Sequence, residues 1–276
     1  MTGRTWLITG VTSGLGRHMA EQLLAKGDRV AGTSRKPEAL DDIRTRHGDA
    51  LWIEPLDVTD TPALRAVVDR AFAAMGRIDV VVSNAGYGIL GAAEELTDDQ
   101  IERQIATNLV GSIQLVRAVV PHLRAQGGGR IIQISTMGGQ ATFPGGSLYH
   151  ASKWGIEGFM DSIRHELAPF GIGVTIVEPG STGTQFGRNL VVAEPLDAYA
   201  DGPLGKARAF FGDGTYASPG DAGKTARAII ETAGMDPAPL RLATGRDAYA
   251  AIHAALTARL ADLEAQKAVA FSTGRD

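Results

Sequence analysis

The feature that most constrains the fold is a glycine-rich turn near the N-terminus. Residues 4–9 form a short apolar run with β-branched side chains, which predicts a buried strand. The run leads into Gly10, Gly14 and Gly16 and then into apolar residues at helical spacing. Glycines here let the backbone approach a pyrophosphate, whose charge the N-terminus of a helix favours. We interpret the segment as a nucleotide-binding strand–turn–helix unit; a simple strand–helix turn is the alternative.

Strand and helix patterns alternate along the rest of the chain, without linkers or repeats. Strands are predicted at residues 4–9, 29–33, 50–54, 79–83, 130–135, 172–178 and 240–244. Helices are predicted at residues 14–26, 37–46, 60–75, 97–125, 148–169, 219–233 and 246–266. Apolar strands separated by helices form parallel sheets covered on both faces, so we expect an α/β fold. Right-handed crossovers then give a Rossmann-type doubly wound sheet of about seven strands in a single domain, with its site at the carboxyl ends of the strands.

Tyr149 and Lys153 stand four positions apart in the helix predicted at 148–169. This spacing places both side chains on one face of the helix. A nearby ammonium group stabilises phenolate, so Lys153 is expected to lower the pKa of Tyr149 from about 10. A tyrosine tuned in this way can give or take a proton at an oxygen atom. For this pattern alone, a surface tyrosine beside a solvated lysine is the alternative.

Composition limits the remaining classes of function. The 276 residues include 27 basic and 31 acidic ones, and the formal charge of −4 gives no electrostatic footprint for nucleic acid. The chain has no cysteine, which excludes thiolate catalysis, and no long apolar span. Its six histidines lack the clustered spacing of a metal site. We therefore expect a cytoplasmic enzyme without a membrane or nucleic-acid partner and without a metal.

Several more motifs follow in a fixed order along the chain. They are Asp57-Val58, Asn84-Ala85-Gly86, Thr107-Asn108 in the long helix, and Pro179-Gly180 with Thr184. Together with the glycine turn and the Tyr149/Lys153 pair, they resemble the classical short-chain dehydrogenase/reductase (SDR) family over about residues 4–245. The order and spacing of the motifs are specific, although no single motif is. The resemblance implies an oxidoreductase that transfers hydride between a nicotinamide and a carbonyl or alcohol.

The resemblance implies four catalytic residues, Thr136, Tyr149, Lys153 and Asn108. In this family the tyrosine protonates the substrate oxygen, the lysine lowers the tyrosine pKa and holds the nicotinamide ribose, and the asparagine anchors a water that links the lysine to solvent. The family usually has a serine thirteen positions before the tyrosine, where this chain has Thr136. Threonine keeps the hydroxyl but adds a methyl group. We assign the serine role to Thr136, with Ser135 as the alternative.

The resemblance also implies a cofactor site, with Asp57 against the adenine and Pro179-Gly180 beside the nicotinamide. The predicted cofactor-binding residues are Gly10, Thr12, Ser13, Gly14, Leu15, Gly16, Ser34, Arg35, Asp57, Val58, Asn84, Ala85, Gly86, Tyr149, Lys153, Pro179, Gly180, Thr182 and Thr184.

The end of the second predicted strand bears on the choice of cofactor. An NAD site usually has Asp or Glu here to bind the ribose 2′-hydroxyl, whereas this chain has Ser34-Arg35-Lys36. Arg35 and Lys36 can bind a 2′-phosphate, which favours NADP over NAD; a solvated basic turn is the alternative. Ser13 lies where many NADP-using members have a basic residue, and Arg17 would compensate only if its side chain turned back.

We divide the single domain, residues 1–276, into three parts. Residues 4–180 form the cofactor-binding core with the catalytic residues, 181–218 a substrate lid, and 219–276 the C-terminal helices and last strand. The lid has little periodicity apart from short helices near 195–200 and 204–211. Its aromatic residues are Phe186, Tyr199, Phe210, Phe211 and Tyr216. With Leu90 and Met137 they predict an apolar pocket for a hydrophobic ketone or secondary alcohol, such as a cyclic or steroid-like one. Packing of the lid onto the body is the alternative.

The last predicted helix has an apolar stripe that we expect to pack on the body or on a partner subunit. Its members are Ala248, Ile252, Leu256, Leu260 and Leu263. The resemblance implies a homodimer or homotetramer, paired through the helix of Tyr149 and the long helix before it.

Two other functions stay open at this point. A non-catalytic NADP-binding redox sensor is favoured by Thr136 but opposed by Tyr149, Lys153 and Asn108, since a sensor needs no proton relay. A nucleotide-sugar epimerase or dehydratase usually has a T-G-x-x-G-x-x-G motif and a longer chain, and neither is seen here.

Overall fold

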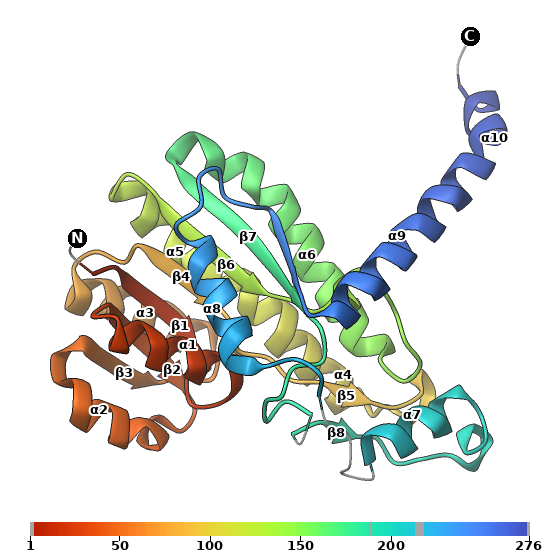
Figure 1. The fold of residues 1–276 in the computed structure, drawn as a ribbon, viewed down its shortest axis with the longest axis horizontal. Helices are drawn as coiled ribbons and strands as arrows, with labels where there is room; N and C mark the ends of the chain where they lie inside the picture. Colours follow the sequence, from red (N-terminus) through yellow and green to blue (C-terminus); the bar gives the residue numbers. More distant parts are fainter. Residues whose placement is uncertain (1–2, 188, 213–217, 275–276) are drawn as a thin grey trace.

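A seven-stranded parallel sheet forms the centre of the molecule (Figure 1). The computed structural model describes residues 3–187, 189–212 and 218–274. In spatial order the strands are β3 (Leu51–Pro55), β2 (Arg29–Ser34), β1 (Thr5–Thr9), β4 (Val80–Ser83), β6 (Gly129–Ile134), β7 (Ile172–Pro179) and β9 (Arg241–Thr244). Each neighbouring pair is parallel. This order is that of a doubly wound Rossmann sheet, and the predicted fold class is confirmed.

Helices cover both faces of the sheet because alternate strand residues point to opposite faces. On one face, Leu7, Val81 and Ile131 of the strands share a buried cluster with residues of α3 (Thr61–Met75), α5 (Gly111–Ala125) and α6 (Ser147–Leu167). On the other face, Ile8 and Val82 share a cluster with α1 (Gly14–Ala25), α2 (Asp41–His47) and α8 (Ala222–Thr232). The two clusters hold the sheet between its helices, and the candidate site lies at the carboxyl ends of the strands.

The helix predicted at 97–125 has an irregular turn in its middle. It consists of α4 (Asp98–Ile105), a π-helical turn at Ala106–Val110, and α5. The predicted helix is present, but the apolar pattern gave no sign of the extra residue in this turn. Isolated π turns are frequent at functional sites, and this turn contains Asn108, which is fully buried.

The lid is attached to the body by a small second sheet. β5 (Ile89–Leu90) and β8 (Val191–Val192) pair in parallel, so the chain after β7 returns to the segment that follows β4. The lid then has a 3₁₀ turn at Asp197–Tyr199 and helix α7 (Pro203–Gly212), near the two predicted short helices.

The C-terminal helix α9 (Arg246–Ala265) extends away from the body and continues into α10 (Lys267–Ser272) (Figure 1). Of the predicted apolar stripe, Ala248 and Ile252 are buried against the body. The outer members, Leu256, Leu260 and Leu263, are 49%, 57% and 65% exposed. Of this apolar stripe, only the members in the first turns of the helix therefore pack as predicted on the described part of this subunit.

Candidate active site

The glycine turn between β1 and α1 makes a close backbone approach. Gly10 and Gly14 have φ values of +73° and +53°, a region that glycine enters without strain. A β-carbon at Gly16 would collide with the carbonyl oxygen of Gly10 and lie 2.7 Å from Asn84 Nδ2. Gly16 therefore serves helix packing, while the turn before it leaves the start of α1 open to an anion.

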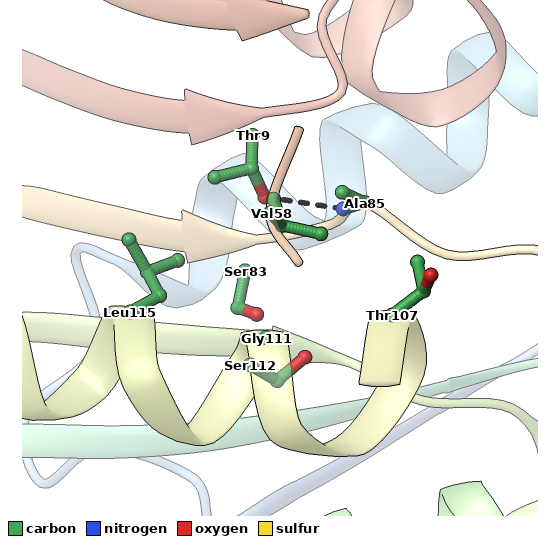
Figure 2. Close-up of a pocket in the computed structure, with 8 residues that line it drawn as sticks. All are labelled: Thr9, Val58, Ser83, Ala85, Thr107, Gly111, Ser112 and Leu115. Carbon is green, nitrogen blue, oxygen red and sulfur yellow. Dashed lines mark hydrogen bonds between the residues drawn. The ribbon is translucent and has the colours of Figure 1, made fainter. Parts of the chain in front are cut away.

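A second turn, Asn84-Ala85-Gly86 after β4, is tied to the first. The Asn84 side chain donates to the carbonyl oxygens of Thr9 (2.8 Å) and Gly10 (3.1 Å). The Thr9 hydroxyl accepts the amides of Asn84 and Ala85, the latter drawn in Figure 2. Beneath this turn α5 approaches closely, since a β-carbon at Gly111 would lie 3.0 Å from the Val58 carbonyl oxygen. The side chain of Asn84 thus joins the two turns.

A cavity of about 1440 Å³ opens at the carboxyl ends of the strands and brings together most of the predicted site. The predicted residues that line it are Gly10, Thr12, Ser13, Gly14, Leu15, Ser34, Arg35, Asp57, Val58, Asn84, Ala85, Gly86, Thr136, Tyr149, Lys153, Pro179, Gly180, Thr182 and Thr184. Gly16 and Asn108 are not on its lining. The cavity exceeds the usual size of a small-molecule pocket, so it has room for both a dinucleotide and a substrate.

Thr136, Tyr149 and Lys153 meet at one end of this cavity. Thr136 follows β6, and its hydroxyl accepts the amide of Gly138 at 3.3 Å. Lys153 Nζ lies 5.9 Å from the centre of the Tyr149 ring and donates to the carbonyl oxygen of Ile134 at 2.9 Å. Tyr149 and Lys153 are both buried, at 9% and 5% exposure. The helical spacing predicted this juxtaposition correctly.

The predicted lowering of the Tyr149 pKa by Lys153 is not what the structure shows. Burial raises the pKa of Tyr149 to about 12, and a hydrogen bond with the Thr136 side chain offsets only part of this rise. The ammonium group of Lys153 points to a backbone carbonyl, and burial lowers its own pKa to about 8, against an opposing effect of Glu157. The pKa of Tyr149 is raised because loss of water around the phenol outweighs the hydrogen bond from Thr136.

Asn108 has its side chain fully engaged with protein groups. Its Oδ1 accepts the amide of Tyr87 at 3.1 Å, while Nδ2 donates to the Tyr87 carbonyl at 2.8 Å and to Ser152 Oγ at 3.1 Å. The π turn presents Asn108 to the segment that follows Gly86. The side chain thus positions the cavity wall around Tyr87.

The part of the cavity around Asp57 contains a cation from the predicted set and one that the sequence did not indicate. Arg35 lines the cavity whereas Lys36 does not, and the Ser34 hydroxyl is hydrogen-bonded to Thr12 Oγ1 at 2.9 Å. Arg103 of α4 also lines it. The pKa of Asp57 is held below its usual value: burial opposes this, but Thr59 hydrogen bonds and both arginines favour the carboxylate.

Arg17 does not turn back toward the cavity. It forms ion pairs with Glu21 at 2.9 Å and with Asp42 at 3.2 Å, and donates to the Ala39 carbonyl. Arg17 therefore does not supply the positive charge that a basic residue at the position of Ser13 would provide.

The other end of the cavity has a largely apolar wall. The Phe186 ring lies 5.7 Å from that of Tyr149, and Leu90 and Met137 line the cavity as predicted. Phe143 and Leu190 were not predicted, because their loops carry no periodic pattern. Tyr216 lies outside the described residues, as does the side chain of Phe211.

Asp247, at the start of α9, is a site residue that the sequence analysis missed. It lines the cavity, and its Oδ2 accepts the amide of Ser181 at 2.6 Å, next to Pro179-Gly180. An acidic residue in the first turn of a helix is so common that position alone gave no signal.

A buried carboxylate, Glu95, holds the lid on the body. It accepts the amides of Ala92 (2.6 Å) and Leu196 (2.8 Å) and pairs with Arg208 of α7. Burial raises its pKa, but these hydrogen bonds and the arginine charge outweigh burial and keep the pKa of Glu95 below its usual value. Glu95 thereby joins two distant points of the lid to the body.

Replacing Glu95 by Gln should loosen the lid. Arg208, which is half-buried, would lose its charged partner, which costs about 1.5–3 kcal/mol. We expect faster limited proteolysis within 195–212 and a higher KM for substrate. Glu94→Gln is the matched control, because among the described residues Glu94 accepts only from the Tyr199 hydroxyl. Equal proteolysis of Glu95→Gln and the wild type would show that Glu95 does not hold the lid.

Two negative findings apply to the residues that the structure describes. No helix among them is long and apolar enough to cross a membrane. They also contain no cluster of three or more His, Asp or Glu side chains arranged to hold a metal ion.

The fold places this chain among the Rossmann-type dinucleotide-binding proteins, and the hydroxyl groups at one end of the cavity point to the oxidoreductases of that class. A family model described as short chain dehydrogenase matches residues 4–194, and the chain belongs to this family. It is therefore an oxidoreductase that acts on CH–OH or C=O groups.

Three proteins illustrate the similarity. Oxidoreductase BOA17 of Botryotinia fuckeliana is 36% identical over 250 residues, 89% of this chain and 90% of that protein. A 3-ketodihydrosphingosine reductase of Bacteroides thetaiotaomicron is 38% identical over 189 residues, 68% of this chain and 67% of that protein. A solved short-chain dehydrogenase from Streptomyces avermitilis is 37% identical, with a TM-score of 0.91 and 100% of both chains covered. More distant structures of the same fold, 22% and 24% identical, bind NADH in one case and NADP in the other.

Proposed function

We propose that this enzyme uses NADP(H) and reduces an apolar ketone, or oxidises the corresponding secondary alcohol. The observation that carries the proposal is that Thr136, Tyr149 and Lys153 meet in one cavity between a glycine turn and an apolar wall. The residues present fit a dinucleotide, because Gly10 and Gly14 keep the turn open at the start of α1. When bound, the reduced cofactor supplies hydride to the carbonyl carbon.

Each residue of this set has a proposed role. Tyr149 donates a proton to the substrate oxygen, and its raised pKa supports this because the phenol is protonated at neutral pH. The Thr136 hydroxyl donates a hydrogen bond to the same oxygen and fixes its position. Lys153, held on the Ile134 carbonyl oxygen, binds the ribose of the cofactor. For the oxidation direction, the positive charge of the oxidised nicotinamide would help to lower the Tyr149 pKa.

We propose that Asn108 supports this set through the π turn. Its side chain fixes the backbone of Tyr87, and Gly86 next to it lies close to Lys153. The water that the family resemblance assigns to this asparagine would then bind beside Lys153 and connect it to solvent.

NADP is the proposed cofactor because Arg35 lies on the cavity lining, where no acidic residue occupies the NAD-type position. Arg103, close to Asp57, adds a second positive charge at this end. Lys36 makes no contribution in this proposal, since its side chain is not part of the lining.

Replacing Arg35 by Ala should raise the KM for NADPH by roughly 10–100-fold, since a charge-assisted hydrogen bond contributes about 1.5–3 kcal/mol. The KM for NADH should stay within a factor of about two, because NADH has no 2′-phosphate. Lys36→Ala is the control and should change neither value. An equal loss with both cofactors would contradict the assignment of Arg35 to the 2′-phosphate.

The apolar wall supports a hydrophobic substrate. The cavity that contains Tyr149 is also lined by the apolar side chains of Phe186, Leu190, Met137 and Phe143. The similarity to a 3-ketodihydrosphingosine reductase, whose name denotes a ketone substrate, supports this proposal.

The direct test is consumption of NADPH, with NADH in parallel, against apolar aldehydes, diketones, cyclic ketones and steroid ketones. Turnover of one group with NADPH would support the cofactor and the pocket together. Turnover with NADH alone would overturn the cofactor choice and keep the proposed chemistry. Turnover restricted to charged carbonyl compounds would overturn the apolar substrate.

We also propose a homodimer or homotetramer, as the family resemblance implies. Exposed apolar side chains on the two relevant helical segments support it: Val110 at the π turn is 42% exposed and Trp154 of α6 is 41% exposed. Light scattering after gel filtration would measure the mass, and a monomer at micromolar concentration would contradict the proposal.

A further inference from the structure

Two glutamates are buried together directly behind the proposed catalytic set. Glu157 of α6 is 3% exposed and Glu178 of β7 is 2% exposed. Carboxylates are almost never buried to this degree unless they are paired or protonated. Neither residue lines the cavity, so neither touches a ligand there.

Both glutamates hold the segment that carries Thr136. Ser135 Oγ donates to Glu157 Oε1 at 2.5 Å. The Gln140 side-chain amide donates to Glu157 Oε2 at 2.7 Å and to Glu178 Oε1 at 3.2 Å. The chain between Ser135 and Gln140 is therefore held by Glu157 at both ends and by Glu178 at the Gln140 end.

The same pair also bears on Lys153. Glu157 lies one helical turn after Lys153, and its charge favours the protonated lysine. Lys153 Nζ donates to the carbonyl oxygen of Ile134, the residue just before Ser135. Glu157 thus acts on Lys153 through its charge and on the neighbouring backbone through Ser135.

The groups that face the pair come from every element packed around it. From β9, Arg241 Nε lies 3.3 Å from Glu178 Oε1 and 3.7 Å from Glu157 Oε2. The two terminal nitrogens of Arg241 donate instead to Asp161 of α6, which Arg164 also binds. From α9, Arg259 donates to the carbonyl oxygen and Oε1 of Gln140, at 2.9 and 3.1 Å.

The two carboxyl groups are also hydrogen-bonded to each other. Burial first, and then the negative charge of Glu157 and its hydrogen bond, raise the pKa of Glu178 to about 7. The Gln140 amide bonds both carboxyl groups and Arg241 Nε faces both, and two charged carboxylates buried around the same donors would repel each other unless one of them held a proton.

We propose that Glu157 and Glu178 form a proton-sharing carboxyl pair that positions Thr136 and Lys153 for the reaction. The inference rests on the proposed function, since it assigns positioning residues to that same site. When the shared proton is lost, the two carboxylates repel each other, the contacts to Ser135 and Gln140 loosen, and the Thr136 hydroxyl leaves its place beside Tyr149.

The linkage to stability has a definite sign. The folded-state pKa of Glu178 is raised, so its contribution is fully present below the unfolded pKa of about 4.3 and is lost as pH rises through about 7. The wild-type Tm should therefore fall over this range by more than the Tm of Glu178→Gln, which keeps a neutral hydrogen-bonding group at the position.

The test is the pH profile of kcat in three variants of the full chain. Wild-type kcat should fall as pH rises through about 7. In Glu178→Gln this fall should disappear, with kcat at pH 6 within about threefold of wild type, because the amide donates as the protonated acid does. Glu157→Gln should lose roughly tenfold or more in kcat across the range, with a smaller change in KM for NADPH, since it removes both the Ser135 contact and the charge beside Lys153.

Asp161→Asn is the matched control. It removes a carboxylate from the same helix and the same arginine but leaves Ser135 and Gln140 untouched, so its pH profile should match the wild type. Infrared spectroscopy provides a readout that needs no turnover: the band of a protonated carboxyl group should be present at pH 6 in the wild type and absent in Glu178→Gln.

The possible failures are distinguishable. If Tyr149→Phe, measured in parallel, loses turnover while both glutamate variants keep the wild-type pH profile and differ only in Tm, the pair is merely structural and this inference is wrong. If Tyr149→Phe keeps turnover, the proposed function itself fails. A wild-type infrared spectrum without the protonated carboxyl band at pH 6 would also overturn the shared proton.

Discussion

Tyr149→Phe should abolish turnover while leaving the fold and cofactor binding in place. The substitution removes one hydroxyl group from a ring that is already buried and in contact with Phe186. General acid–base catalysis by a positioned side chain contributes about 10²–10⁴-fold, and kcat should fall by that factor. The dissociation constant for NADPH, measured by nicotinamide fluorescence, should change by less than about threefold, because the glycine turn and Arg35 are untouched.

Tyr249→Phe provides the matched control for this result. Tyr249 lies on α9, is 68% exposed, and has no part in the cavity lining. It should keep wild-type kcat. Full turnover by Tyr149→Phe would show that Tyr149 is not the proton donor. Loss of NADPH binding would instead indicate a structural role for its hydroxyl group.

Gly16→Ala should weaken cofactor binding and the fold together. The added β-carbon would collide with the carbonyl oxygen of Gly10, which is backbone and belongs to the turn itself. Overpacking costs about 1–3 kcal/mol, which corresponds to roughly 10–100-fold in the NADPH dissociation constant if the strain falls on the bound form. Calorimetry would give the binding change, and thermal unfolding would give the change in Tm.

Gly158→Ala is the control for the glycine substitution. Gly158 also lies in a helix, α6, but a β-carbon there would meet no atom within 4 Å. Alanine has the higher helix propensity, by about 1 kcal/mol, so this variant should be as stable as the wild type or more stable. Normal binding by Gly16→Ala would show that the turn can widen without loss.

The fold, and most of the residues that line the cavity, could be predicted from the sequence because both depend on local signals. Strand and helix periods, and short motifs after strands, placed β1 with its turn and the Tyr149/Lys153 pair correctly. The raised pKa of Tyr149 was beyond such reasoning, because it depends on how completely distant segments exclude water. Glu95 and the Glu157–Glu178 pair were missed for the same reason: their partners lie far away along the chain, and single acidic residues carry no pattern.

The π turn at Ala106–Val110 has a consequence for how chain length can change near this site. A π turn holds one residue more than the regular turn it replaces, so deleting one residue there would restore an unbroken α-helix. Every residue before the deletion would then rotate by about 100° relative to α5, one residue's share of a helical turn. The side chains of Arg103 and Asn108 would then point in different directions, relative to the cavity wall, from those they have now. We therefore expect that deleting one residue from this turn leaves the fold intact but disrupts the site.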